Sequence, residues 1–228
     1  MLHIIGLGLD NNEITRKGIE ALKKVDKAYA EFYTNTANID LESLPCEVEL
    51  LEREEVEQED KILKSAETQD TAFLVSGDPL TATTHYDIKH RAEEKGLEVE
   101  VVHAPSIFTS VAETGLNIYK FGRTVTLPEN GEPESIVEHI GKNDSVGLHT
   151  LVLLDIDLEA SKAAQKLLDL GLENREAVVI ERANREDMNV KASTLKEISD
   201  MQLGDTPHSI VLTGEKSFKE EEFLESHE

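Results

Sequence analysis

The chain has 228 residues, with 47 acidic against 23 basic side chains and a formal net charge of -24. Such a surface repels phosphate groups, which argues against direct binding of DNA or RNA. The single cysteine excludes an intrachain disulfide and fits a reducing compartment. No apolar run approaches the roughly 18 residues that a membrane span needs, and no basic signal region opens the sequence. We therefore expect a cytoplasmic protein that binds neither nucleic acid nor membrane.

The acidic residues are spread along the chain, from Glu13 to the run at 220–222. This spread is typical of salt-adapted cytosolic proteins, in which salt screens the repulsion between like charges. A solvated acidic surface without environmental meaning explains it equally well. A steep rise of the unfolding midpoint in KCl would separate the two interpretations.

The first half of the chain alternates predicted strands and helices. An apolar run at 2–5 ends in a glycine-rich turn, and Thr15 is the expected N-cap of the helix that follows. The helix at 83–95 is expected to end at Gly96, and Ser106 to cap a segment at 107–113. The other expected elements are strands at 28–33, 48–51, 71–76 and 99–103 and a charged helix at 54–66. This alternation predicts a mainly parallel sheet flanked by helices.

The second half has more strands and fewer helices between them. A helix at 159–170 should end at Gly171, and a short one is expected at 194–201. The expected strands are 124–127, 148–154, 177–180, 188–192 and 209–212. We therefore predict two domains, 1–114 with a parallel sheet and 115–228 with a mixed sheet. The stretch 127–140 is interpreted as short, and the tail 219–228 as frayed and dispensable.

Two glycine motifs follow predicted strands. Gly6-Leu7-Gly8 lets a ligand approach the backbone closely, although a tight turn explains it equally well. It lacks the third glycine of a dinucleotide fingerprint, which disfavours NAD. Gly77-Asp78-Pro79 lies where ligand crevices form in open α/β sheets, although an ordinary Asp-Pro turn is an alternative.

Other reaction chemistry has little support. No two histidines have the i, i+4 spacing of a helical zinc site, so no metal is expected. Cys46 has no adjacent base, and no Gly-x-Ser-x-Gly elbow is present. The stretch 214–217 lacks the upstream glycine of a phosphate loop. Acyl transfer and phosphoryl transfer are therefore disfavoured.

Taken in order, the motifs resemble the diphthine synthases, a family with the tetrapyrrole-methylase fold. The glycine loop at 4–9 is common to that fold, but three stretches point to this family: Ala-Glu-Phe-Tyr-Thr at 30–34, Ala-Thr-Thr-His at 82–85 and Ile-Tyr-Lys-Phe-Gly at 118–122. The resemblance continues through 103–107, 147–156 and 204–208 and covers nearly the whole chain.

The resemblance implies an α/β fold of two domains with a cofactor cleft between them. It implies a homodimeric, S-adenosylmethionine-dependent enzyme that methylates the amino group of a modified histidine on translation elongation factor 2, on the way to diphthamide. Archaeal relatives carry that amine to the trimethylammonium form. The cofactor contacts that carry over, several through backbone groups, are Leu9, Asp78, Thr81, Ser106, Ile107, Leu154, Ala183 and His208.

The sequence departs from the family in four places. Ser76 precedes Gly77 where the family usually has proline, and Asn184 follows Ala183 where a small residue is usual. The stretch 127–140 and the tail after 213 are short, which points to a reduced substrate-facing loop. The catalytic base stays unassigned, with His85 and Asp78 as candidates.

Two rival functions stay open. A precorrin or uroporphyrinogen methylase would keep the fold, but its polycarboxylate substrate needs a basic cleft that a net charge of -24 makes hard to build. A non-catalytic small-molecule sensor would keep the cofactor crevice and lack methyl transfer. Tight cofactor binding without turnover on any acceptor would select the sensor.

Overall fold

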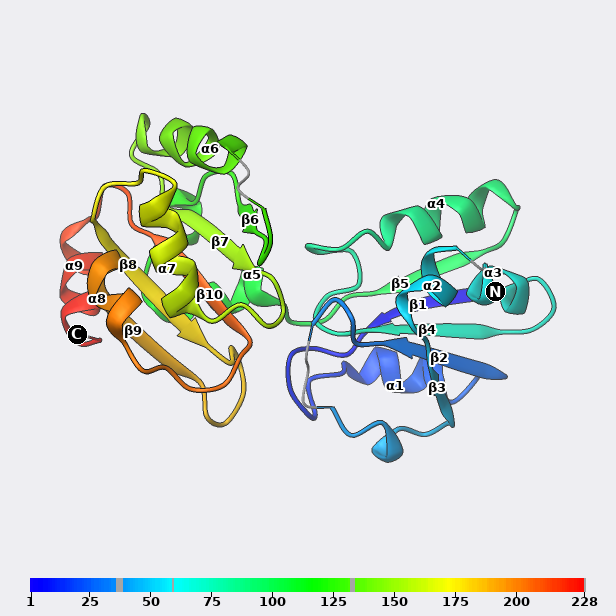
Figure 1. The fold of residues 1–228 in the computed structure, drawn as a ribbon. Coiled ribbons are helices and arrows are strands. Elements are labelled where there is room, and N and C mark those ends of the chain that lie inside the picture. Colours follow the sequence, from blue (N-terminus) through cyan, green and yellow to red (C-terminus); the bar gives the residue numbers. More distant parts are fainter. Residues whose placement is uncertain (36–38, 59, 132–133, 228) are drawn as a thin grey trace. The chain divides into compact units, whose positions relative to one another are not determined.

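The computed structural model describes residues 1–35, 39–58, 60–131 and 134–227, which form two compact units, Met1–Thr109 and Ser110–Glu228 (Figure 1). The units divide after Thr109, a few residues before the expected division after residue 114. The expected position is the end of the helical stretch formed by α5 (Ile107–Ser110) and η2 (Val111–Thr114). Among the described residues, no helix is both long and apolar enough to cross a membrane.

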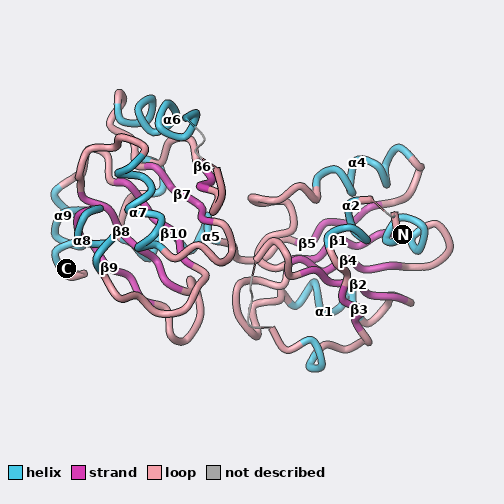
Figure 2. The backbone as a smooth tube through the Cα atoms, viewed as in Figure 1, coloured by secondary structure: helices cyan, strands magenta, loops and turns pink. Residues whose placement is uncertain are grey.

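The first unit is built on a five-stranded parallel sheet, in the order β3-β2-β4-β1-β5 (Figure 2). Its central strands are apolar and buried on both faces, as parallel sheets require. The prediction of a parallel sheet is confirmed. The strands are β1 (Leu2–Gly6), β2 (Lys27–Glu31), β3 (Val48–Leu50), β4 (Thr71–Val75) and β5 (Val99–Val102).

Helices cover both faces of this sheet. On one face, α1 (Arg16–Leu22) packs its Leu22 against Ile5 and Leu74. Thr15 caps α1 as expected, because its side chain accepts the Gly18 N–H. On the other face lie α2 (Arg53–Glu57), α3 (Lys61–Ala66) and α4 (Tyr86–Glu94).

Two helix predictions in this unit were wrong in extent. The single helix expected at 54–66 is divided into α2 and α3, and Asp60 between them has a left-handed φ of 56°. The segment is dense in like charges, which a continuous helix would bring together. The helix expected from residue 83 begins only at Tyr86, after Ala82 with a φ of 55°. It ends at Gly96 as predicted.

The second unit contains a five-stranded mixed sheet, in the order β6-β7-β10-β8-β9, with only β6 and β7 parallel. The prediction of a mixed sheet is confirmed. Helices α7 (Ala160–Asp169) and α8 (Leu195–Asp200) belong to the core cluster of this sheet. The strands are β6 (Val125–Leu127), β7 (Thr150–Leu154), β8 (Glu176–Glu181), β9 (Asn189–Thr194) and β10 (His208–Leu212).

The helix α6 (Glu134–Asp144) was not predicted, because the stretch 127–140 was interpreted as short. Ile136 and Ile140 of α6 are buried against β6. Their i, i+4 spacing was the signal available in the sequence. A short 3-10 segment, η1 (Leu41–Ser43), was also missed.

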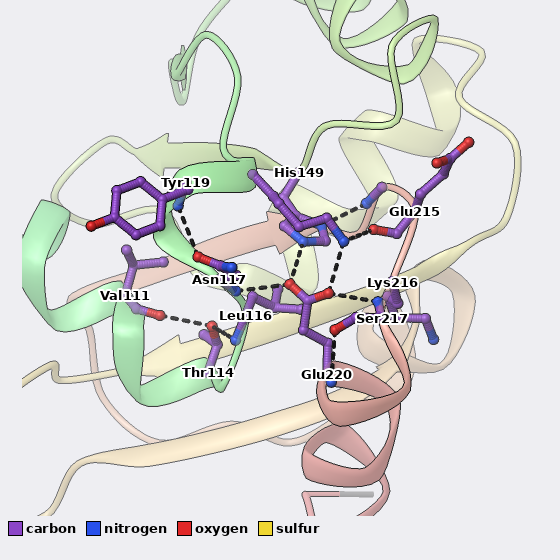
Figure 3. Close-up of polar contacts among 12 residues, drawn as sticks. Val111, Thr114, Leu116, Asn117, Tyr119, His149, Glu215, Lys216, Ser217 and Glu220 are labelled. Carbon is purple, nitrogen blue, oxygen red and sulfur yellow. Dashed lines mark hydrogen bonds and ion pairs between the residues drawn. The ribbon is translucent and has the colours of Figure 1, made fainter.

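The tail is ordered, and the prediction that it is frayed was wrong. It forms α9 (Phe218–Glu225), with Ser217 and Glu220 in a capping box. Glu220 is buried and accepts a hydrogen bond from Asn117 N–H at 2.8 Å (Figure 3). Lys120 Nζ donates to the same carboxylate at 2.8 Å. His149 Nε2 lies 3.2 Å from the same carboxylate. The local sequence shows only that Glu220 is charged, because these partners lie between 71 and 103 residues away along the chain.

Candidate functional site

Four loops of the first unit leave the same edge of its sheet. Because β1, β2, β4 and β5 are parallel, their carboxyl ends all meet there. The loop after β1 carries Gly8 and Leu9, and the loop after β4 carries Gly77 and Asp78. Ligand crevices in open α/β sheets form at this edge.

Backbone bonds join the two glycine loops directly. Gly77 N donates to Gly8 O at 2.7 Å, and Gly8 N donates to Gly77 O at 3.3 Å. A Cβ on Gly6 would lie 2.6 Å from Gly77 O, so only glycine allows the loops to approach this closely. The glycines therefore do more than turn the chain, because they bring two loops into one surface.

Asp78 fixes the second loop. Its Oδ1 accepts from Leu80 N–H at 3.1 Å and Thr81 Oγ1 at 2.9 Å, and its Oδ2 lies 2.7 Å from His103 Nδ1. Burial alone would raise the pKa of Asp78, but these hydrogen bonds outweigh it and lower the pKa. The carboxylate is thus a charged, fully engaged acceptor, which suits holding a loop better than taking a proton.

The structure brings the cofactor residues expected in this unit to the same place. Around Gly77, whose φ is 71°, a built Cβ would find Leu9 Cδ2 at 3.4 Å and Pro105 O and Ser106 Cβ at 3.9 Å. Thr81 is bonded to Asp78, and Ile107 begins α5. Because Gly77 has no side chain, its backbone is accessible beside the fixed carboxylate of Asp78. This arrangement fits a polar cofactor.

His85, the other candidate base, is buried with only 1% of its surface exposed. Its Nδ1 lies 2.7 Å from Thr83 Oγ1, and its Nε2 lies 3.5 Å from the Tyr33 hydroxyl. The ring of Phe73 meets the imidazole edge to face at 5.0 Å. Burial lowers the pKa of His85 to about 4, so the ring is neutral at neutral pH. A side chain this covered reaches a substrate only through a neighbour.

Sequence reasoning missed Glu31, which ends β2 and is fully buried. Its carboxylate accepts from Thr34 Oγ1 at 2.5 Å and Thr34 N–H at 3.0 Å, and its Oε1 lies 3.8 Å from His85 Nε2. Burial raises the pKa of Glu31, although the bonds from Thr34 oppose it. A glutamate directly after the run Ala28-Tyr29-Ala30 was the available signal.

The site residues expected in the second unit lie along one edge of its own sheet. Leu154 ends β7, Ala183 follows the end of β8, and His208 begins β10 beside Glu181. The antiparallel register places β7's end and β10's start next to each other. These three positions are therefore neighbours within the second unit.

His208 is buried and uses one ring nitrogen. Its Nδ1 accepts the N–H of Ala160, the first residue of α7, at 3.1 Å. Burial lowers the pKa of His208, against the opposing charge of Glu181. Its Nε2 makes no hydrogen bond to any described residue and lies 3.9 Å from Glu181 Oε2. This nitrogen is a donor that a bound ligand can satisfy.

No group of three His, Cys, Asp or Glu side chains within the described ranges is placed to hold a metal ion. The polar groups available for chemistry in the first unit are those of the loop surface around Gly77 and of the cluster of Glu31, Tyr33 and His85.

Comparison with known proteins assigns this arrangement to a class and then to a family. Residues 1–199 match the family model described as Tetrapyrrole (Corrin/Porphyrin) Methylases, which makes the protein a methyltransferase by class. The "Diphthine methyl ester synthase" of Schizosaccharomyces pombe is 38% identical, over 94% of this chain and 89% of the relative. The "Diphthine synthase" of Methanococcus maripaludis is 37% identical, over 98% of this chain and 97% of the relative. The chain belongs to the tetrapyrrole methylases and, within them, to the diphthine synthase family.

A solved structure supports the same assignment. "Crystal structure of diphthine synthase" superposes with a TM-score of 0.92 at 31% identity, covering 99% of this chain and 95% of that one. The predicted family and the predicted α/β fold with one parallel and one mixed sheet are confirmed. The prediction of a methyltransferase is confirmed as well.

Proposed function

We propose that this protein is an S-adenosylmethionine-dependent methyltransferase of diphthamide biosynthesis. Its substrate is the amino group of the modified histidine of translation elongation factor 2. The observation that carries the proposal is the match over 94–98% of the chain to relatives named for this product. The loop surface around Gly77 and Asp78 supplies the place for a cofactor.

S-adenosylmethionine supplies an already activated methyl group when it is bound. We propose that Leu9, Asp78 and Thr81 hold it from the first unit, together with Ser106 and Ile107. From the second unit we propose Leu154, Ala183 and His208. Two chemical features support these assignments: Asp78 offers a fixed negative charge, and His208 Nε2 is a buried polar atom within 3.9 Å of Glu181 that makes no hydrogen bond of good geometry to the described residues.

The protein's main task in this reaction is positioning. Holding nucleophile, methyl and sulfur in line contributes roughly 7–11 kcal/mol of barrier reduction. The amine must be neutral when it attacks, and the low dielectric of a protein site lowers the pKa of its ammonium form. Asp78, whose oxygens are already engaged, is better assigned to loop geometry than to the role of base.

Esterification is a second candidate reaction, because relatives from S. pombe and Homo sapiens are named "Diphthine methyl ester synthase". A methyl ester forms on the carboxylate of the same modified histidine. Both reactions add the same mass per methyl group, so mass alone does not separate them. Mild alkali does, because it hydrolyses an ester and leaves an N-methyl group in place.

The test is intact-mass spectrometry of elongation factor 2 carrying the aminocarboxypropyl-histidine intermediate, after incubation with this protein and S-adenosylmethionine. We expect whole methyl increments that survive alkali and disappear when the target histidine is replaced. Increments lost in alkali would assign ester formation. Cofactor binding without any increment would favour a macrocycle methylase or a small-molecule sensor.

We further propose that the enzyme is a cytoplasmic homodimer adapted to high salt. The net charge of -24 supports the salt adaptation, because dissolved ions screen the mutual repulsion of an acidic surface. Running the methylation assay and thermal unfolding from dilute to molar KCl tests it. A flat response of both would contradict salt adaptation and leave the methyltransferase proposal untouched.

A further inference from the structure

Beside the loop surface lies a cluster that the proposed cofactor contacts do not use: Glu31, Tyr33 and His85. Glu31 and His85 are buried, and Tyr33 is half-buried. The cluster is linked to the cofactor loop, because Asn35 Nδ2 donates to Ser76 Oγ at 2.9 Å and Thr83 contacts His85. Its role, which rests on the proposed function, concerns how the substrate amine loses its proton.

Methylation of nitrogen releases a proton in every round, whereas methylation of a carboxylate releases none. An amine that has received a methyl becomes an ammonium ion, and it must lose a proton before its lone pair attacks again. A repeated N-methyltransferase therefore needs a group that accepts this proton at the reaction site. An ester-forming enzyme does not need such a group.

The Tyr33 hydroxyl and the Glu31 carboxylate both lie near one ring nitrogen of His85, Nε2. Of the three, only Tyr33 is more than slightly exposed, and its hydroxyl lies 3.5 Å from His85 Nε2. Thr83 Oγ1 at 2.7 Å from Nδ1 fixes the imidazole, so Nε2 faces Tyr33. Glu31 Oε1 lies 3.8 Å from the same Nε2, so its charge is close to any proton that this nitrogen takes up.

The surroundings of the cluster keep His85 neutral at neutral pH, so one of its ring nitrogens retains a lone pair. Burial lowers the pKa of His85 to about 4, an effect that Glu57 of α2 opposes. Burial raises the pKa of Tyr33, and Glu31 and Glu57 add to this while Arg53, whose guanidinium lies 5.5 Å from the Tyr33 ring, opposes it. A protonated His85 therefore gives its proton up readily at neutral pH.

We propose that Tyr33 receives the proton of the substrate amine and that His85 and Glu31 are positioned to take up its charge. The Tyr33 oxygen accepts a proton from the ammonium as the phenol proton passes to His85 Nε2. The nitrogen keeps the electron pair of the broken N–H bond, and the Glu31 carboxylate balances the imidazolium. When the product leaves, His85 returns its proton to Tyr33 and the excess proton passes to water.

The decisive variant is Tyr33→Phe, which removes one hydroxyl, with Tyr86→Phe as the matched control on the exposed neighbour of His85. Tyr33→Phe should slow N-methylation at pH 7 about a hundredfold and accumulate the monomethyl product. Its rate should rise about tenfold per pH unit, because hydroxide then removes the proton instead. Tyr86→Phe should keep the wild-type methyl count and pH profile.

A second readout needs no turnover. The relay requires the proton of neutral His85 on Nδ1, so nitrogen NMR of the free protein should show Nε2 as the unprotonated acceptor. Tyr33→Phe should shift the Nε2 resonance, and Tyr86→Phe should not. Cofactor affinity measured by calorimetry should stay the same in both variants. A proton found on Nε2 would overturn the relay.

Failure of this inference differs from failure of the proposed function. If the wild-type enzyme adds no methyl group to nitrogen, both the proposed function and the proton relay are contradicted. If the wild-type enzyme methylates nitrogen and Tyr33→Phe gives the same methyl count and pH profile, only the proton relay is contradicted. His85→Gln gives an independent check, since it should share the pH-dependent rescue of Tyr33→Phe.

Discussion

Each unit of this protein places a histidine beside a buried glutamate, and the two pairs differ in what surrounds them. In the second unit, Glu220 lies 3.2 Å from His149 Nε2 and also receives Lys120 and two backbone N–H groups. In the first unit, Glu31 lies 3.8 Å from His85, and its carboxylate accepts hydrogen bonds from Thr34 and from the backbone of Tyr33, none of which carries a charge.

The pKa values follow these surroundings. Burial raises the pKa of both glutamates, but the bonds to Glu220, led by Lys120, reverse the effect and lower its pKa strongly. Glu31 keeps a raised pKa. The same two residue types thus form a structural cluster in one unit and a proton-responsive cluster in the other, and the charged donor Lys120 beside Glu220 makes the difference.

The largest expected effect concerns His85 and acid. Burial lowers its pKa from 6.5 to about 4, so between these values the unfolded chain binds a proton that the folded protein does not. Stability should therefore fall as pH drops from 6.5 to 4, by up to about 3 kcal/mol. Urea unfolding of wild type and His85→Gln across this range measures it. The same pH dependence in both proteins would contradict the assignment.

Glu220→Gln should weaken the hydrogen-bonded cluster around residue 220 in the second unit. At pH 7 it should cost about 2–3 kcal/mol of unfolding free energy, because buried donors lose a charged acceptor. Since the folded pKa is lowered, this contribution is complete above the unfolded pKa of about 4.5 and is lost as pH falls below it. Glu222→Gln on the exposed side of α9 is the control and should change stability by less than about 0.5 kcal/mol.

Thr34→Val removes the hydroxyl donor to Glu31 and should cost about 1 kcal/mol at pH 7. The cost should shrink in acid, where Glu31 is protonated and needs fewer donors. Chemical denaturation of Thr34→Val in wild-type and Glu31→Gln backgrounds measures the coupling between the two residues. Full additivity would show that the hydroxyl acts elsewhere.

The smallest effect should come from Glu31→Gln, and its sign should be opposite to that of Glu220→Gln. A raised folded pKa means that ionised Glu31 costs stability once pH exceeds about 4.5. The amide carries no charge, so we expect stability at pH 7 to rise by no more than about 1 kcal/mol. If Glu31→Gln lowered the free energy of unfolding as much as Glu220→Gln in the same denaturation assay, the proposed difference between the two glutamates would be wrong.

Local sequence was sufficient for much of the fold. The apolar runs of β1 and β4, the Thr15 cap and the Gly96 stop were all predicted, because strand burial and helix capping depend on near neighbours. The glycine loops were placed at the right edge of the sheet for the same reason.

Tertiary structure decided the rest. α9 depends on Glu220 meeting Lys120, and the cluster of the first unit depends on the ends of β2 and β4 bringing Glu31 to His85. Each pair joins residues far apart in sequence, and the sequence gives no register between them. A charged residue in a sequence is expected to be exposed to solvent. It is stable when buried only if hydrogen-bond donors surround it, and here those donors are brought together by the tertiary structure.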